Sequence, residues 1–440
     1  MSLFSTLSTA ASGLGIAGTR LSVIGDNIAN INTIGFKSAR PQFADLVARD
    51  SMGLSGPSQI GTGGATDTVS VQFGQGAITE SENALDIAIS GNGFYTVSDT
   101  DHEFDYYTRD GQFYVDDSGF IVNAGGYRVQ GYNATNGALT TIVSDLKIDS
   151  DALAQQASST LEMSAILSTD ADFSTTPLSS GSFTLDGNTD SIDDAAQGAD
   201  FATSVTIYDS LGTAHDCTVL FERESATDWG WYAIVDGGEV GETDGMAFEI
   251  SSGALSFDAD GNLDTFTQTD TSVASPWNFT GADDLTLEFE FGVDPTGDDN
   301  GGNLRAVAGP SAVTSVSQDG YGTGDLIQIS VDQEGIISGT YTNGEDLTLG
   351  QFVLADFPSY LGLKRTGHNL FQATTDSGDP AIGAPGSGPR GSLISFALEQ
   401  SNVDLEDEFV DMIQSQRTYQ ANARVITTTD GTLQELVQLL

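Results

Sequence analysis

Apolar residues recur every three or four positions at both ends of this 440-residue chain. This spacing is typical of helices that pack against a helical partner, so we predict one helix at each end. Ser401 or Asn402 can cap the second helix. The first set, the N-terminal seam, comprises Leu3, Leu7, Ala10, Leu14, Ala17, Leu21, Ile24 and Ile28. The second set, the C-terminal seam, comprises Leu405, Phe409, Met412, Gln416, Tyr419, Ala423, Ile426, Asp430, Leu433, Val437 and Leu440.

The partner of each terminal helix can be the other helix of the same chain or a helix of another copy. Pairing within one monomer is the simpler interpretation. The N-terminal segment, however, contains Gly13, Gly15 and Gly18, and glycine costs about 1 kcal/mol in a helix interior. Because its seam also includes small alanines, this helix buries little apolar area. We therefore expect it to become ordered when several copies pack together.

The stretch between the terminal helices has the pattern of β structure. Short alternating apolar segments are separated by turn residues at hairpin spacing in 113–122, 255–263 and 329–337. Segments 51–67 and 376–392 are rich in Gly, Ser, Thr and Pro, which favours extended connectors. The predicted fold class is mostly β with α-helical termini, in which the terminal helices pair as an inner coiled-coil layer and β-rich domains are inserted between them.

Four parts follow from this pattern, each of the first three built from both halves of the chain. They are an inner helical assembly domain (1–30 with 400–440), an extended connector region (31–72 with 371–399), an inner β domain (73–148 with 311–370) and an acidic outer β domain (149–310), which can divide into two subdomains.

Negative charge is concentrated in the predicted outer domain. The chain has 14 basic and 63 acidic residues, for a net charge of −49, and 31 of the acidic residues lie in 149–310, where only Arg223 and Arg305 are basic. Such a surface repels nucleic-acid phosphates and anionic lipid head groups, so neither is an expected partner. No apolar run approaches the roughly 18 residues of a membrane span, and the first residues do not resemble an ordinary cleaved signal. We expect no membrane insertion.

The candidate chemical sites are weak. In His215-Asp216-Cys217 three reactive residue types are adjacent, but neighbours in a strand point to opposite faces. Asp258 and Asp260 begin a stretch that resembles a calcium loop, yet its twelfth position is Thr269 rather than glutamate, so a hairpin turn is the better interpretation. The sequence predicts no catalytic site, no metal site and no cofactor, and therefore no enzyme.

Two segments, one near each end, resemble the bacterial flagellar rod and hook family. In SGLGIAGTRLSVIGDNIANINTIGFK, residues 12–37, the most distinctive positions are Asn27, Asn30, Asn32, Gly35, Phe36 and Lys37. In LEQSNVDLEDEFVDMIQSQRTYQANARVI, residues 398–426, they are Ser401, Asn402, Val403, Asp404, Gln416, Arg417 and Tyr419. The long acidic insert favours a hook-type subunit, and a distal rod protein is the alternative. A free extracellular enzyme or calcium-dependent adhesin is a more remote possibility.

The resemblance implies a structural role outside the cell. A hook-type subunit would polymerise with copies of itself into a curved, flexible, hollow tube that transmits torque from rod to filament and conducts exported subunits. Its expected partners are the distal rod protein, the hook cap, the hook–filament junction protein and the flagellar type III export apparatus, which exports subunits without cleaving a signal peptide. Phe43 and Val47 match the Phe-x-x-x-hydrophobic pattern that such subunits present to the export gate.

Overall fold

The computed structural model describes most of the chain as two compact units. The described residues are 3–53, 56–99, 105–135, 137–148, 153–170, 178, 185–270, 278–292 and 303–438. Unit 1 comprises Met1–Ser150, Ile327–Thr340 and Asp346–Leu440, and unit 2 comprises Asp151–Leu326 and Tyr341–Glu345. Unit 2 therefore contains residues 151–310 of the acidic segment 149–310.

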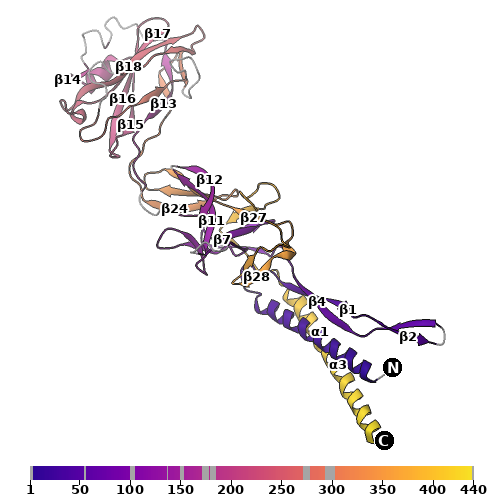
Figure 1. Ribbon diagram of the computed structural model, residues 1–440. Helices are drawn as coiled ribbons and strands as arrows, with labels where there is room; N and C mark the ends of the chain where they lie inside the picture. The colour runs from indigo at the N-terminus through magenta and orange to yellow at the C-terminus, as the bar shows by residue number, and fades with distance from the viewer. Residues whose placement is uncertain are drawn as a thin grey trace. The chain divides into compact units, whose positions relative to one another are not determined.

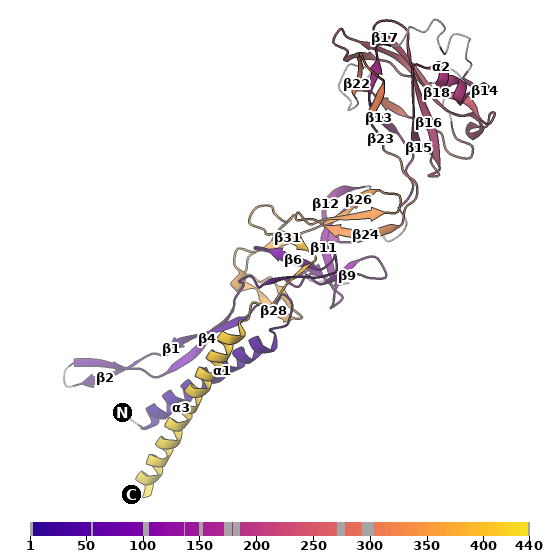
Figure 2. The ribbon, with the colours of Figure 1, turned by 180° about the vertical axis from the view of Figure 1, so that it is seen from behind.

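Two long helices from opposite ends of the chain lie side by side in unit 1 (Figures 1 and 2). They are α1 (Leu3–Ala29) and α3 (Leu405–Gln438), as the seams predicted. The predicted cap of α3 is wrong, because the Asp404 carboxylate accepts the N–H groups of Glu406, at 2.8 Å, and Asp407, at 3.3 Å. Asn402 is engaged elsewhere, since its amide donates to the carbonyl of Gln72 and accepts the N–H of Ser38.

The segment after α1 forms a β-hairpin arm rather than the predicted connector. Strand β1 (Ala39–Asp45) pairs antiparallel with β4 (Gly64–Val71), and β2 (Arg49–Gly53) pairs with β3 (Gly56–Ile60) further along the same arm. Gly, Ser and Thr are abundant here, but they do not prevent backbone pairing when both edges of the hairpin are available. Composition alone therefore did not predict the strand pairing within 51–67.

The β part of unit 1 is a large sheet whose strands do not follow chain order, with two small additional sheets. Its main path runs β24-β25-β26-β11-β7-β8-β29-β28, with β9, β10, β12, β27 and β30 attached. The aromatic core includes Phe94, Tyr95, Phe113, Phe352 and Phe371. The strands are β7 (Phe94–Ser98), β8 (Asp105–Thr108), β9 (Phe113–Val115), β10 (Ile121–Asn123), β11 (Arg128–Thr135), β12 (Ala138–Asp145), β24 (Leu326–Val331), β25 (Ile336–Tyr341), β26 (Asp346–Phe352), β27 (Leu354–Asp356), β28 (Lys364–Gly367), β29 (Leu370–Gln372) and β30 (Ala381–Gly383). The hairpins predicted at 113–122 and 329–337 are confirmed.

The predicted connector segment 371–399 also contains paired strands. Strand β30 pairs with β27, β31 (Ser392–Ser395) pairs with β6 (Ile87–Ser90), and β32 (Ala397–Glu399) pairs with β5 (Ile78–Glu80). These partners are distant in sequence, so no local sequence pattern predicts the pairings. A short 3-10 helix, η3 (Tyr360–Gly362), precedes this segment.

Unit 2 is a two-sheet β structure around a large aromatic core. The longer sheet has the order β14-β18-β17-β16-β15, with β19 and β20 on β18, and the shorter sheet has β21-β13-β22, with β23 on β13. Trp229, Trp231, Phe289 and Phe291 are fully buried in this core. The elements are β13 (Thr160–Ser168), β14 (Asp186–Ser191), α2 (Ile192–Gly198), β15 (Phe201–Tyr208), β16 (Ala214–Arg223), β17 (Asp228–Asp236), η2 (Gly237–Val240), β18 (Met246–Phe257), β19 (Leu263–Phe266), β20 (Thr269–Asp270), β21 (Glu288–Glu290), β22 (Asn303–Val307) and β23 (Ala312–Gln318).

The candidate chemical residues of unit 2 lie as expected for a strand and a turn. Asp258 closes the β18–β19 hairpin, because its carboxylate accepts the N–H groups of Asp260 and Asn262. His215 and Cys217 are buried on one face of β16, and Asp216 is exposed on the other. Burial raises the pKa of the Cys217 thiol to about 12, which makes it a poor nucleophile at neutral pH.

Candidate assembly interface

The residues of the predicted N-terminal seam lie on the buried side of α1. Ala10, Ala17 and Ile24 are buried, and the intervening seam residues Leu7, Leu14, Leu21 and Ile28 are half-buried. Leu3 lies in α1, but its side chain is outside the described residues. Small residues let the helices approach closely, as at Gly13, where an added Cβ would lie 2.7 Å from the Asn422 amide nitrogen.

The face of α3 that contacts α1 differs from the predicted C-terminal seam. Met412, Ile426 and Leu433 are half-buried as expected, but the alternate positions are shifted by one residue. Ser415 and Thr429 are buried there, whereas Gln416 and Asp430 are exposed. Glu408 and Asn422 are also half-buried on this face. Of the two predicted residues beside them, Phe409 is exposed and Ala423 is half-buried. Apolar periodicity could not find this seam, because half of it is polar.

The single chain leaves a set of large apolar side chains on α3 exposed. We call it the outer stripe, and its members are 39–65% exposed. Three of them, Leu405, Phe409 and Tyr419, belong to the predicted C-terminal seam, so in the single chain they are not buried against α1. Val437 lies in α3 with its side chain outside the described residues, as Leu440 is altogether. The outer stripe consists of Leu405, Phe409, Val410, Ile413, Tyr419 and Val425.

Polar contacts fix how α3 lies on α1. The Asn27 amide donates to Glu408 Oε1 at 2.8 Å and to the Ala39 carbonyl at 2.9 Å, and its oxygen accepts the Ala39 N–H. Arg20 Nη2 lies 2.9 Å from Asp411 Oδ1. Burial raises the pKa of Glu408, and the bond from Asn27 opposes that rise. Asn27 thus joins the end of α1 to both α3 and β1.

The chain reverses direction after α1 in a turn built from the N-terminal signature. Asn30 donates to the Asp26 carbonyl, and Gly35 has a φ of 68°, with its N–H bonded to the Glu399 carbonyl at 2.7 Å. A Cβ on Gly35 would lie 2.7 Å from the backbone of Arg109, so glycine is required. Asn32 is exposed.

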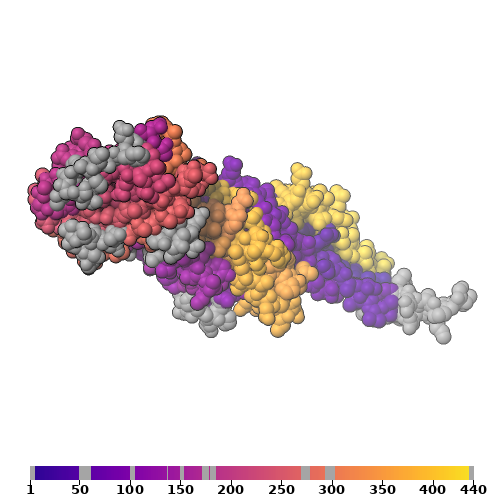
Figure 3. Space-filling model, turned by 90° about the horizontal axis from the view of Figure 1, so that it is seen from above, coloured from indigo at the N-terminus to yellow at the C-terminus, as the bar shows by residue number. Residues whose placement is uncertain are grey.

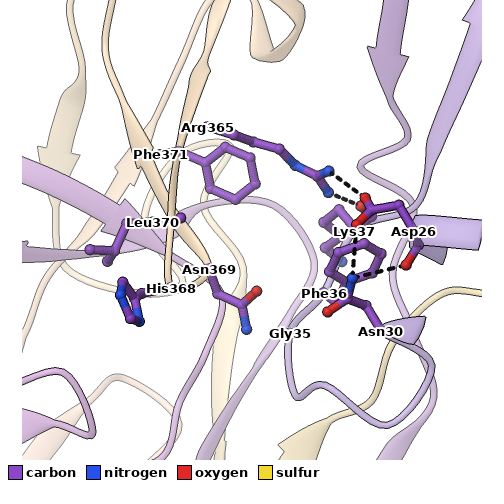
Figure 4. A pocket seen from close by; sticks show the side chains of 11 residues that line it. Asp26, Asn30, Gly35, Phe36, Lys37, Arg365, His368, Asn369, Leu370 and Phe371 are labelled. Carbon is purple, nitrogen blue, oxygen red and sulfur yellow. Dashed lines mark hydrogen bonds and ion pairs between the residues drawn. The ribbon is translucent and has the colours of Figure 1, made fainter. Parts of the chain in front are cut away.

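The β28–β29 hairpin covers this turn (Figure 4). The Arg365 guanidinium lies 4.9 Å from the centre of the Phe36 ring, donates to the Lys37 carbonyl, and comes within 3.9 Å of Asp26. Asn369 donates to the Ile34 carbonyl at 2.8 Å. These contacts hold the chain leaving α1 against the β sheet of the same unit.

A buried ion cluster lies beneath the turn, and sequence reasoning missed two of its three members. Lys37 Nζ is 2.6 Å from Glu399 Oε1, and Arg109 Nη1 is 3.2 Å from Glu399 Oε2. The Glu399 and Lys37 side chains have no exposed surface. The Gly76 N–H also donates to Glu399 Oε1, at 2.8 Å, and Lys37 donates to the Gly74 carbonyl. Burial lowers the pKa of Lys37, and Glu399 opposes that effect. A glutamate inside the apolar β32 strand was the available signal.

The other predicted residues divide between structural and exposed positions. Ser401 accepts the Val403 N–H at 3.3 Å, and Gln416 and Arg417 are exposed on α3. Phe43 is 38% exposed on β1, where the β1–β4 register shifts, and Val47 is 91% exposed. No group of His, Cys, Asp and Glu able to hold a metal occurs among the described residues. No helix in the described part of the chain is long and apolar enough to cross a membrane.

Comparisons with known proteins match this arrangement along the whole chain. Family models match residues 7–37 (flagella basal body rod protein), 88–160 (flagellar hook protein FlgE/F/G D1 domain), 177–321 (flagellar basal body protein FlaE D2 domain) and 394–439 (flagellar basal body rod FlgEFG protein C-terminal). The flagellar hook protein FlgE of Escherichia coli (strain K12) is 34% identical over 438 residues, which cover 98% of this chain and 99% of the relative. The chain belongs to the flagellar hook protein family. The FlgE of Salmonella typhimurium is likewise 34% identical, over 99% of this chain and all of that relative.

These matches include the acidic insert, and they favour a structural hook subunit over the distal rod alternative. The mostly β fold with packed terminal helices also agrees with a solved relative. The crystal structure of Helicobacter pylori flagellar hook protein FlgE2 aligns with a TM-score of 0.51, covering 73% of this hook protein and 99% of that chain, at 13% identity. At that identity the likeness concerns the fold alone.

Proposed function

We propose that copies of this chain polymerise through their terminal helices into the curved, hollow tube of a bacterial flagellar hook. The observation that carries this proposal is the outer stripe on α3, whose side chains are exposed in the single chain. The space-filling view shows the C-terminal part of the chain, in yellow, at the surface (Figure 3). Burying such side chains gains about 25 cal/mol per Å² of apolar surface. A stripe of this length on a 34-residue helix is therefore a favourable place for a neighbouring copy.

The geometry of one chain favours an open polymer over a closed dimer. The outer stripe is on α3 alone, while the other exposed apolar side chains near the helices, Phe43, Leu46 and Val47, lie on and beside β1. Contact between two different patches is heterologous, and a heterologous contact that does not close gives a helical tube. Residues 1–50, with four basic and three acidic side chains, would pack in the inner layer around the channel, and the acidic unit would be exposed to water.

A pair of substitutions tests the role of the outer stripe. Phe409→Ser with Ile413→Ser should leave the monomer folded, because both side chains are about half exposed, but should abolish tube formation. The matched control, Phe409→Leu with Ile413→Val, keeps the apolar surface and should form tubes. The measurement is electron microscopy after salting-out, together with circular dichroism of the monomer. Normal tubes from the serine variant would refute this assembly interface.

We also infer the partners that a hook subunit requires. Family membership supports contacts with the distal rod protein at one end of the polymer, with the hook cap during growth and with the hook–filament junction protein at the other end. It supports a location in the flagellar hook and basal body, outside the cell, and a purely structural role in which the tube acts as a universal joint. The division of the chain into two compact units would let layers of the tube shift as it bends.

Export through the flagellar type III apparatus, without a cleaved signal, is the second part of the proposal. Phe43 and Val47 are exposed, so the fold does not need them in its core, and this supports a role in recognition by the export gate. Phe43→Ala with Val47→Ala should reduce secretion while leaving the purified chain folded. Leu46→Ala, which removes an exposed side chain between them, is the control. Normal secretion of the double variant would rule out this motif.

A further inference from the structure

Unit 2 contains a buried histidine whose two ring nitrogens both contact carboxylates. His215 on β16 is 8% exposed, and its Nδ1 lies 2.8 Å from Glu239 Oε2 on η2. Its Nε2 lies 3.2 Å from Asp209 Oδ2 in the turn after β15. An ionised carboxylate only accepts hydrogen bonds, and a neutral imidazole has a single N–H. Both contacts can be hydrogen bonds at the same time only when each ring nitrogen carries a proton.

A ring contact favours the same protonation state independently. The His215 and Phe279 rings are 3.5 Å apart between centroids and 1° from parallel. Two neutral aromatic rings prefer an offset or edge-to-face arrangement, whereas a cation is attracted to the face of an aromatic ring. The face-to-face stack is therefore better suited to an imidazolium than to a neutral imidazole. On the neighbouring strand β15 the residue paired with His215 is the apolar Ile207, so Asp209 and Glu239 are the charged groups that contact the ring.

The histidine joins three separate pieces of unit 2. The other oxygen of Asp209 accepts the N–H groups of Leu211 and Thr213, each at 2.8 Å, and so closes the turn between β15 and β16. The carbonyl of Glu239 on η2 accepts the N–H of Thr280 at 2.8 Å. Phe279, the neighbour of Thr280, is the residue that stacks on the ring.

The clamped turn also contacts the segment through which the chain enters unit 2. The Gln155 amide donates to the Ser210 carbonyl at 3.3 Å, and Ser210 Oγ accepts the N–H of Asp283 at 2.8 Å. Ser158 N–H donates to the Tyr208 carbonyl at 2.9 Å. A loosened turn would therefore weaken this end of the acidic unit.

We propose that His215 is a pH-sensitive clamp of unit 2. With a proton on each nitrogen, it fastens the 209–213 turn, η2 and the segment around Phe279 to one another. When pH rises, one nitrogen gives its proton to solvent. Its lone pair then faces a carboxylate oxygen, so two acceptors meet without a proton between them and the clamp opens. The acidic unit is consequently tighter in mildly acidic than in alkaline surroundings.

Hydrogen exchange of the full-length chain measures the clamp directly. The Leu211 and Thr213 amides bond to Asp209, so their exchange reports opening of the turn. Because charge-assisted hydrogen bonds are about twice as strong as neutral ones, we expect opening to increase about tenfold or more between pH 5.5 and 8.5, after correction for intrinsic exchange. The chain has only three histidines, so side-chain ¹⁵N signals can be assigned, and His215 should show both nitrogens protonated at pH 5.5.

Two variants separate the clamp from a general effect of pH. In Glu239→Gln the new amide can donate to a neutral Nδ1 or accept from a protonated one, so the turn should stay closed across the range. His368→Gln removes an exposed histidine of unit 1 and should keep the pH dependence of the wild type. The proposal is overturned if the His215 ring is neutral at pH 5.5, or if Glu239→Gln retains the tenfold change.

Discussion

Glu399→Gln should be one of the most damaging single substitutions in unit 1. It removes the carboxylate whose two oxygens lie 2.6 Å from Lys37 Nζ and 3.2 Å from Arg109 Nη1 in their buried cluster. Removing one partner of a buried ion pair costs about 3–5 kcal/mol, because the remaining charge is left without compensation in a low dielectric. The substituted amide also presents an N–H group toward two donors, so it cannot replace the lost acceptor.

Two spectroscopic probes assign the loss to unit 1. The long helices α1 and α3 belong to unit 1, so circular dichroism at 222 nm in a urea titration follows this unit. Trp229 and Trp231 are buried in the core of unit 2, so their fluorescence follows that unit. We expect the free energy of unfolding from dichroism to fall by about 3–5 kcal/mol, with the fluorescence transition unchanged.

A half-exposed ion pair provides the matched control for the buried cluster. Arg20 and Asp411 are 33% and 48% exposed, so Asp411→Asn should cost about 1 kcal/mol or less. Lys37→Met alone should lower the free energy of unfolding. The double variant with Glu399→Gln should lose less free energy of unfolding than the two single variants together, with a coupling energy of about 0.5–3 kcal/mol. If Glu399→Gln costs no more than Asp411→Asn, the reasoning about this cluster is wrong.

Three further predictions concern the helix pair and the turn beside it. Gly13→Leu should force α1 and α3 apart and lower the helical circular dichroism, because even a Cβ at this position would lie 2.7 Å from the Asn422 amide nitrogen. Adding Asn422→Ala should restore part of the lost signal. An unchanged signal in Gly13→Leu would contradict the close contact. Gly35→Ala should lower the free energy of unfolding of unit 1, measured by urea titration, by more than about 1 kcal/mol. The φ of Gly35 is 68°, and an added Cβ would lie 2.7 Å from the Arg109 backbone. Because the pKa of Glu408 is raised in the folded chain, its contribution to the stability of the helix pair is present below pH 4.5 and is lost as pH rises through the pKa of the folded state. The melting temperature of the helices should therefore fall between pH 4 and 7. Glu408→Gln should make that fall smaller than in the wild type.

The terminal helices were predictable because their heptad spacing is local and strong, whereas the register between them was not. Hydrophobic periodicity ranks Phe409 above Glu408 and Ala423 above Asn422, yet the structure turns the polar members toward α1. The reason is that Asn27 offers a hydrogen-bond donor to Glu408, and the missing side chain at Gly13 leaves room for Asn422. Such contacts depend on a partner some 400 residues away in sequence, and no window of the chain contains both.

The strand pairings in the connector regions were unpredictable for a related reason. Segments 51–67 and 371–399 have few apolar residues and many turn formers, but their strands pair with partners that supply the missing half of each ladder. Where the chain folds back on itself, backbone hydrogen bonds to a partner strand stabilise a short polar strand. The cap of α3 was misplaced similarly, because Asn402 is drawn into bonds with Ser38 and Gln72 and leaves Asp404 to cap the helix.

Four of the signature residues and the outer stripe have different roles in assembly. Asn27, Gly35, Lys37 and Asn402 all bond within the junction that joins the helix pair to the β sheet of unit 1, and none of them belongs to the outer stripe. The junction fixes the rotation of α3 about its axis, and that rotation decides which way the outer stripe faces. A defect in the junction should therefore impair assembly while every apolar side chain of the stripe is present, whereas a polar substitution in the stripe should impair assembly in a monomer of normal stability.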